Sequence, residues 1–291
     1  MTLQSNSGLD QTKSSVAVLP VCRGIYSVGA LEQYPELVVG ISTRTAPDGG
    51  DWNLSSRRGT PQHPPDPAVA LANRIKLAEA LGIDFDMIVG CQQVHGAEVA
   101  VVNATDAGRG MKPGLPSIEG VDAMVTSTPG LFLMVLAADC PPVFFYDPVS
   151  RVVGLAHSGW KGTTGRIAGK VVEAMAEQFG SRPDDIQAVI GPGVGPCCYN
   201  VRDDVIKEVE SSFPGVWQAQ NIGALLMCDE GLVYFNLWAA IKRALLDVGV
   251  TADNISSDAV CSAHNTGTFY SHRGEAGKCG LFGGIIGLRN G

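Results

Sequence analysis

Three stretches of apolar residues each end in a side chain that can bind a transition metal. The terminal residues are His95, Cys140 and His157, and a glycine or a proline follows each of them within two positions. Two imidazoles and one thiolate are a common donor set for zinc, and three protein ligands leave a fourth position open for water. A bound metal ion turns such a water into a nucleophile near neutral pH. The triad therefore predicts a catalytic metal centre with about one zinc ion per chain.

Charged and glycine-rich residues near these ligands could also take part in the chemistry. Asp139 precedes Cys140 and could orient a ligand histidine, act as a general acid and base, or simply end a strand in a turn. Residues 158–165 contain Lys161 and lead into a predicted helix, whose free backbone N–H groups could bind an anion. The glycine-rich residues 190–199 are expected to form a pocket wall or a tight crossover.

The elements that must position these residues can be predicted from hydrophobic periodicity. Strand-length apolar runs cover Leu37–Ser42, Met87–Cys91, Val99–Val102, Ala123–Thr126, Leu131–Ala137, Val143–Tyr146, Val152–Ala156, Ala188–Ile190 and Ala259–Ser262. Helical periodicity covers Pro67–Leu81, Thr164–Phe179, Asp203–Phe213 and Phe235–Val248. These segments contain more strands than a simple alternating pattern, and no G-x-G-x-x-G motif follows a strand. We therefore predict the α/β class: a single-domain layered α/β sandwich with mixed sheets, not a Rossmann fold.

One of the helices, one long loop and the N-terminus lead to more detailed expectations. The helix over 67–81 is expected to turn the row Ala68, Leu71, Ile75 and Ala78 toward one side. Residues 45–66, rich in glycine, proline and charge, are expected to form a surface loop. Residues 1–35 are expected to be a partly disordered leader and a first strand, and residues 36–291 a single metalloenzyme domain.

Composition and charge limit the partners of the protein. The 291 residues carry a net charge of −8 and a pI near 5.1, which argues against nucleic acid or an anionic membrane as the main partner. No apolar run reaches the roughly 18–20 residues that a membrane span needs, and the N-terminus lacks the features of a secretory signal. The eight cysteines are therefore expected to be reduced, in the cytoplasm. The sequence leaves monomer and homodimer open.

Several motifs occur in an order that resembles the YfiH/laccase-domain family. Members of that family are described as polyphenol oxidases, peptidoglycan editing factors and purine nucleoside phosphorylases. The matching segments are QVHG (93–96), DAMVT (122–126), ADCPPV (138–143), AHSGWKGT (156–163), IGPGVGPCCYNV (190–201), FNLW (235–238) and FYSHR (269–273).

The resemblance implies an α/β sandwich enzyme with zinc on His95, Cys140 and His157. It implies phosphorolysis of adenosine, inosine, guanosine and methylthioadenosine, together with deamination of adenosine, so purine nucleosides and phosphate are the expected partners. The same triad and Asp139 are the expected catalytic residues.

For the substrate or phosphate pocket, the resemblance points to Arg44, Lys161 and Arg273. The usual GWRG of the family is GWKG here, so Lys161 keeps the charge but lacks the planar fork of an arginine. The C-terminal SYRR pattern is Ser-His-Arg-Gly at residues 271–274.

Three other functions compete with a purine nucleoside phosphorylase that has adenosine deaminase activity. A copper-dependent polyphenol oxidase (laccase) would need on the order of ten histidines, whereas the chain has five, although copper remains an alternative metal for the triad. A peptidoglycan-precursor editing hydrolase could use the same centre to cleave an amide. A zinc-stabilised interaction domain is disfavoured because structural zinc sites close with four ligands, and the sequence patterns supply three.

Overall fold

The computed structural model describes residues 21–217 and 224–290. Most of its strands belong to two six-stranded sheets. The first contains, in spatial order, β1 (Val21–Cys22), β2 (Ile25–Tyr26), β3 (Leu37–Ser42), β15 (Phe282–Leu288), β7 (Phe132–Ala137) and β4 (Ile88–Gly90). The second contains β14 (Ile255–Ser257), β10 (Gln187–Ile190), β8 (Pro142–Asp147), β9 (Val152–His157), β6 (Ala123–Thr126) and β5 (Val99–Val101). Both sheets are mixed, because the β4–β7, β5–β6 and β10–β14 pairs are parallel and the other pairs are antiparallel.

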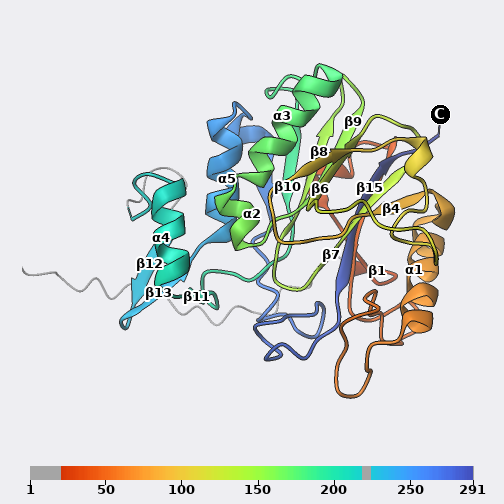
Figure 1. The fold of residues 1–291 in the computed structure, drawn as a ribbon, viewed down its shortest axis with the longest axis horizontal. Helices are drawn as coiled ribbons and strands as arrows, with labels where there is room; N and C mark the ends of the chain where they lie inside the picture. Colours follow the sequence, from red (N-terminus) through yellow and green to blue (C-terminus); the bar gives the residue numbers. More distant parts are fainter. Residues whose placement is uncertain (1–20, 218–223, 291) are drawn as a thin grey trace, which may run out of the picture.

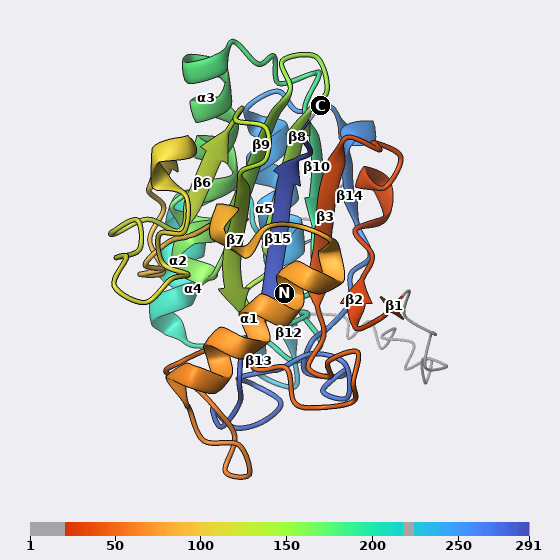
Figure 2. The same ribbon diagram turned by 90° about the vertical axis from the view of Figure 1, so that its right-hand side faces the viewer.

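The two sheets pack face to face, and helices cover their outer faces (Figure 1). Helix α1 (Pro67–Leu81) lies across the first sheet (Figure 2), and α3 (Ile167–Phe179) and α5 (Leu237–Asp247) cover the second. The short α2 (Trp160–Thr164) precedes α3. Short 3-10 helices cover Gly29–Leu31, Phe85–Met87, Ala104–Asp106 and Ala252–Asn254. The predicted layered α/β sandwich is therefore confirmed.

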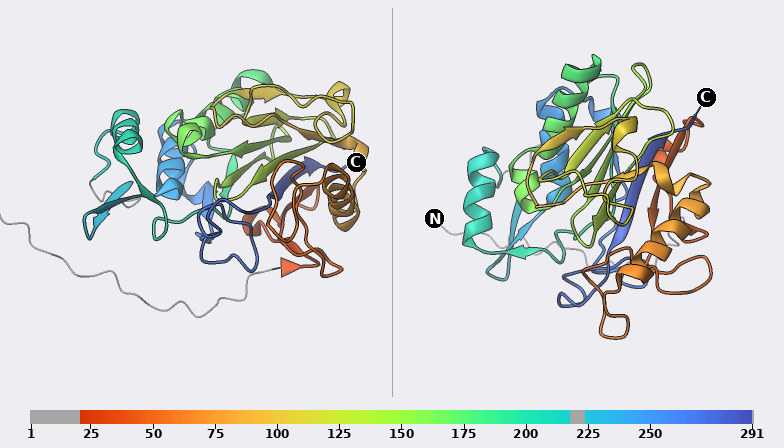
Figure 3. Two further views of the ribbon diagram at one scale, coloured as in Figure 1. Left: turned by 60° about the horizontal axis from the view of Figure 1, so that its bottom comes forward. Right: turned by 45° about the vertical axis from the view of Figure 1, so that its right-hand side comes forward.

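A third, small sheet stands at one end of the molecule beside α4 (Asp203–Ser212), as Figure 3 shows. It is antiparallel and has the order β11 (Asn200–Val201), β13 (Leu232–Phe235) and β12 (Leu226–Asp229). Its own cluster of buried residues includes Val209, Phe213 and Phe235.

The continuous apolar runs arise because the central strands are buried on both faces. In β7, Leu133 and Val135 point into the core between the sheets, whereas Phe132 and Met134 point toward α1. Side chains of a strand alternate between faces, so both sets must be apolar here.

The predicted bounds of α1 are confirmed, but the predicted buried face is wrong. Asp66 accepts hydrogen bonds from the amides of residues 68 and 69, Pro67 occupies the first turn, and Gly82 ends the helix with φ +66°. The buried residues are Ala70, Asn73, Leu77 and Ala78, whereas Ile75 is 37% exposed. The face is rotated because residues 51–53 form hydrogen bonds with Asn73, which the periodicity of the helix could not reveal.

Residues 45–66 are not only a surface loop. Trp52 and Leu54 are completely buried, and the Trp52 indole donates a hydrogen bond of 2.9 Å to the carbonyl of Asn73. The Asn73 side chain in turn donates to the carbonyls of Asp51 and Asn53. The loop is therefore anchored on α1, which brings residues 55–58 to the cavity described below.

Strand predictions failed at the C-terminal end of the chain. The run Ala259–Ser262 is not a strand: Ala259 has a φ of +50°, and within the run an isolated bridge joins Cys261 to Gly193. Instead β14 ends at Ser257, and β15 is a strand that periodicity did not predict. Glycines weaken strand propensity, but a Cβ on Gly284 would lie 3.0 Å from the Phe144 ring, so close packing of the two sheets explains the glycine there.

The other helix predictions hold with smaller changes. The predicted helix Thr164–Phe179 corresponds to α3, which begins only at Ile167 because Arg166 has a φ of +58°; Thr164 is the last residue of α2. Of the predicted leader and first strand over residues 1–35, residues 1–20 lie outside the described residues, and β2 pairs with both β1 and β3. Within 21–217 and 224–290, no helix combines the length and apolar character needed to cross a bilayer.

Candidate metal centre

The structure brings the three predicted ligands together at the ends of their strands. His95 lies in the turn after β4, Cys140 lies between β7 and β8, and His157 is the last residue of β9. Their donor atoms all lie within 4.8 Å of one another, and the two imidazole rings meet edge to face with centroids 4.9 Å apart. His157 is buried, Cys140 is half-buried and His95 is exposed, so the cluster opens to one side.

Asp122, which the sequence patterns did not single out for a role, organises two of these ligands. Its carboxylate is completely buried and accepts a hydrogen bond of 2.8 Å from Nδ1 of His157. It also accepts from the backbone N–H groups of Val94, His95 and Gly96, at 3.0, 3.1 and 2.7 Å. Because Nδ1 carries the proton, Nε2 of His157 is free to bind a metal. One carboxylate therefore fixes the tautomer of one ligand and the turn that carries the other.

The backbone around the ligands is adapted to their close approach. His95 has a φ of +60°, a left-handed conformation that is costly for a residue with a side chain. The three hydrogen bonds from the 94–96 turn to Asp122 offset this cost. Gly159 must lack a side chain, because a Cβ there would lie 2.9 Å from Sγ of Cys140 and 3.4 Å from the His95 ring.

The ligand side chains favour a thiolate next to an imidazolium when no metal is bound. Burial alone would raise the pKa of the Cys140 thiol, but the charges and hydrogen bonds of His157 and His95 hold it at about 6. Burial would likewise lower the pKa of His157, but Cys140 and Asp122 raise it to about 9. Burial opposes ionisation of Asp122 as well, yet its hydrogen bonds with His157 and the 94–96 turn lower its pKa. A thiolate and an ionised carboxylate behind an imidazole form an environment that attracts a cation.

The donor set fits a catalytic transition-metal site. Zinc is bound by thiolate and imidazole, and catalytic zinc sites have three protein ligands with an open position. A carboxylate behind a ligand histidine, as in the pair Asp122 and His157, is the usual outer support of such sites.

A cavity of about 920 Å³ opens over the triad. Its size is within the range of small-molecule pockets. Two aromatic residues, Trp160 and Tyr199, contribute to its wall, and the arginines that line it are Arg57, Arg58, Arg74 and Arg273. An overall acidic protein therefore presents a basic pocket next to its candidate metal centre.

Asp139 lines this cavity but does not orient a ligand histidine, because Asp122 occupies that position. Its Oδ1 accepts hydrogen bonds of 2.6 Å from the hydroxyls of Ser262 and Ser271, and its Oδ2 accepts one of 2.6 Å from the amide of Arg273. Asp139 thus connects the Cys140 strand end to the segment that carries Arg273.

Among the predicted phosphate-binding residues, the structure brings Arg273 to the cavity. Its guanidinium lies over the Tyr199 ring, 5.3 Å from the centroid, and donates to the carbonyl of Cys198 and to Asn200. Lys161 does not line the cavity, although its Nζ lies 5.5 Å from the ring centroid of Trp160, which does.

Arg44 does not line the cavity either. It forms an ion pair of 3.1 Å with Glu275, lies over the Tyr270 ring and donates to the carbonyl of Thr266. Glu275 in turn accepts a hydrogen bond of 2.9 Å from the amide of Ser271. Arg44 therefore holds the 266–275 segment in place behind the cavity wall.

Two further groups of residues were missed by sequence patterns. Arg57 and Arg58 reach the cavity because residues 51–55 are anchored on α1, and their amides are held by the Ser55 hydroxyl. A second cluster of donors consists of Cys197, Cys198, Cys261 and His264. The sequence patterns indicated the three donors of the first cluster but not these four, because the residues of the second cluster lie far apart in the sequence.

Comparisons with known proteins agree with this fold. The chain matches, over residues 51–289, the family described as multi-copper polyphenol oxidoreductase laccase. Purine nucleoside phosphorylase YlmD of Geobacillus stearothermophilus is 35% identical over 221 residues, which cover 75% of this chain and 78% of that protein. Adenosine deaminase RL5, from an unknown prokaryotic organism, is 34% identical over 202 residues, which cover 69% and 74%. The crystal structure of YlmD from G. stearothermophilus has a TM-score of 0.83 at 31% identity, covering 93% of this chain and 98% of that one.

The sandwich and its strand-end Cys/His cluster thus define a protein of the laccase-domain class. This chain belongs to the multi-copper polyphenol oxidoreductase laccase family, the YfiH/YlmD family that its motifs predicted.

Proposed function

We propose that this protein is a zinc-dependent purine nucleoside phosphorylase that also deaminates adenosine. The observation that carries the proposal is the opening of the His95, Cys140 and His157 cluster into a basic, partly aromatic cavity of about 920 Å³. The proposal is supported by relatives that are named purine nucleoside phosphorylase and adenosine deaminase and are more than a third identical to this chain.

His95, Cys140 and His157 would hold the metal, with Asp122 behind His157. When bound, zinc would act as a Lewis acid and activate a water molecule near neutral pH. We favour zinc over copper because the donor set is that of a catalytic zinc site. A multi-copper oxidase centre is excluded by the histidines, since the other three of the five, His63, His264 and His272, are not in the cluster.

The cavity offers one surface that suits the purine base of a nucleoside and another that suits phosphate. The half-buried rings of Trp160 and Tyr199 can pack against a purine base. Arg273, with Arg57 and Arg58, would bind the phosphate, because arginine pairs with phosphate through two parallel hydrogen bonds. We assign this task to these arginines instead of Arg44 and Lys161, which do not line the cavity.

Asp139 would transfer the proton. Its Oδ1 already accepts two hydrogen bonds, whereas Oδ2 accepts only the amide of Arg273 and retains a free acceptor site. Oδ2 is therefore the atom that can take up a proton and return it to the leaving amine in deamination. We also propose that the enzyme is cytoplasmic, since purine nucleosides are its proposed substrates and its eight cysteines are unpaired.

The purified protein should be incubated with adenosine, with and without inorganic phosphate, and the release of inosine, adenine and hypoxanthine followed. We expect inosine to form in both conditions and free base to form only with phosphate. The Cys140→Ala variant should form neither product. Absence of both products from zinc-loaded protein would refute the proposal. Turnover of a peptidoglycan precursor under the same conditions would then favour the editing hydrolase.

A further inference from the structure

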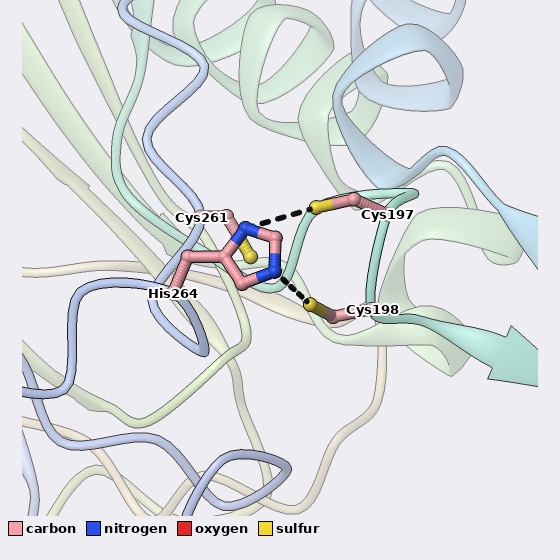
Figure 4. Close-up of side chains that lie close together, drawn as sticks. All are labelled: Cys197, Cys198, Cys261 and His264. Carbon is pink, nitrogen blue, oxygen red and sulfur yellow. Dashed lines mark hydrogen bonds between the residues drawn. The ribbon is translucent and has the colours of Figure 1, made fainter. Parts of the chain in front are cut away.

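A second cluster of metal-binding side chains lies outside the cavity. Cys197 and Cys198 follow the 190–196 segment, and Cys261 and His264 lie in the segment after β14 (Figure 4). One donor atom from each of the four lies within 4.8 Å of the others. None of the four lines the cavity over the first cluster.

The distances within this cluster are close to those of a tetrahedral site. Sγ of Cys197 lies 3.7 Å from Nδ1 of His264, and Sγ of Cys198 lies 3.1 Å from Nε2. A zinc ion with Zn–S of about 2.3 Å and Zn–N of about 2.0–2.1 Å would separate its donors by roughly 3.5–3.8 Å. The exposed His264 ring turns one nitrogen toward each of the two sulfurs (Figure 4), so a small rotation would direct one nitrogen to an ion.

We propose that Cys197, Cys198, Cys261 and His264 bind a second zinc ion, which is structural. Three thiolates and one imidazole are a usual donor set of structural zinc, and four protein donors leave no open position. This closed set differs from the open His95, Cys140 and His157 cluster, so the two sites would have different roles.

A metal site explains this arrangement better than a disulfide or core packing does. A bond between the adjacent Cys197 and Cys198 would close a strained ring, and no disulfide is formed by the eight cysteines, all of which are described. Cys197 and His264 are exposed, so they do not contribute to a core. A disulfide between Cys197 and Cys261 would not explain why the Cys198 thiol and the His264 ring also lie in contact.

The second ion would join two segments that already meet at a parallel bridge between Gly193 and Cys261 and through a hydrogen bond from Gly195 N–H to the Cys261 sulfur. Gly193 donates to the carbonyl of Val260 at 3.2 Å, and Ser262 donates to the carbonyl of Gly193 at 2.9 Å. The same segments carry groups of the cavity: Tyr199 lines it, and the Ser262 hydroxyl binds Asp139. A structural ion would therefore hold the wall of the cavity in place without touching the substrate.

Zinc content of the reduced full-length protein tests the proposal. We expect about two zinc ions per chain in the wild type and about one in Cys261→Ser, His264→Ala or Cys140→Ala. A chain that carries both Cys140→Ala and Cys261→Ser should bind none. Cys228→Ser, which alters an exposed cysteine of β12 outside both clusters, should keep about two.

Cobalt provides a second readout that does not depend on activity. Replacing zinc by cobalt in the wild type should give strong thiolate-to-cobalt absorption that Cys140→Ala retains and Cys261→Ser largely loses. About one zinc per chain in the wild type, removed by Cys140→Ala, would overturn the proposal. A mass of the unreduced protein that is lower by two hydrogens, with Cys261 in a disulfide, would also overturn it. These outcomes leave the proposed purine activity untouched, since that activity is measured separately.

Discussion

Replacement of Asp122 by asparagine tests how the buried carboxylate controls the metal centre. Asparagine has one acceptor oxygen, whereas the carboxylate of Asp122 serves His157 and the amides of Val94, His95 and Gly96 with two. If the amide oxygen faces Val94 and Gly96, the NH₂ group faces Nδ1 of His157 and forces the proton onto Nε2. That tautomer cannot bind the metal through Nε2.

The opposite orientation keeps the correct tautomer but is costly. The NH₂ group would then face the amides of Val94 and Gly96, and each buried donor left without a partner costs about 1–3 kcal/mol. If the first orientation is adopted without metal, zinc binding must overcome the cost of changing to the second. We therefore expect Asp122→Asn to weaken zinc binding about 10–100-fold, the usual effect of losing a partner of a ligand histidine.

Competition with a chelator measures this affinity, in the Cys261→Ser background so that the second cluster does not contribute. Asp147→Asn is the matched control, because Asp147 is equally buried but lies at the end of β8 remote from Cys140. The control should bind zinc like its parent. Folded Asp122→Asn protein with an affinity within about threefold of its parent would refute the reasoning, since that is less than 1 kcal/mol.

Three other substitutions test the remaining features of the site. Gly159→Ala should lower zinc retention about tenfold or more after dialysis, because the new methyl group would lie 2.9 Å from Sγ of Cys140; full retention would contradict this. Asp139→Asn should lower the free energy of unfolding in urea by about 1.5–3 kcal/mol, the value of a charged hydrogen bond, and also slow deamination. Unchanged stability would show that its three hydrogen bonds contribute little. Arg273→Ala should raise the KM for phosphate in inosine cleavage about 10–100-fold, with a much smaller effect on deamination of adenosine. Equal losses in both reactions would argue against a phosphate-binding role.

Local signals in the sequence were sufficient for several elements. The bounds of α1 could be predicted because Asp66, Pro67 and Gly82 act through hydrogen bonds and backbone angles within one turn of the helix. The central strands could be predicted because burial on both faces requires uninterrupted apolar residues. The metal centre could be predicted because His95, Cys140 and His157 are metal-binding residue types at the ends of apolar runs.

Contacts between distant residues were decided only by the tertiary structure. Asp122 could not be assigned to His157 because a carboxylate beside a strand has no local signal for its partner. Strand β15 was hidden by glycines that are explained only by the adjacent sheet. The role expected for Arg44 came from the family resemblance, whereas the position of its side chain is set by Glu275, 231 residues away.

The same reason separates the two metal clusters. The first was visible in the sequence because each ligand ends its own apolar run, and neighbouring strand ends meet at one edge. The second joins Cys197 and Cys198 to Cys261 and His264, which lie on two irregular segments without periodicity. Local sequence determines the conformation of a segment, but which irregular segments meet depends on packing of the whole sandwich.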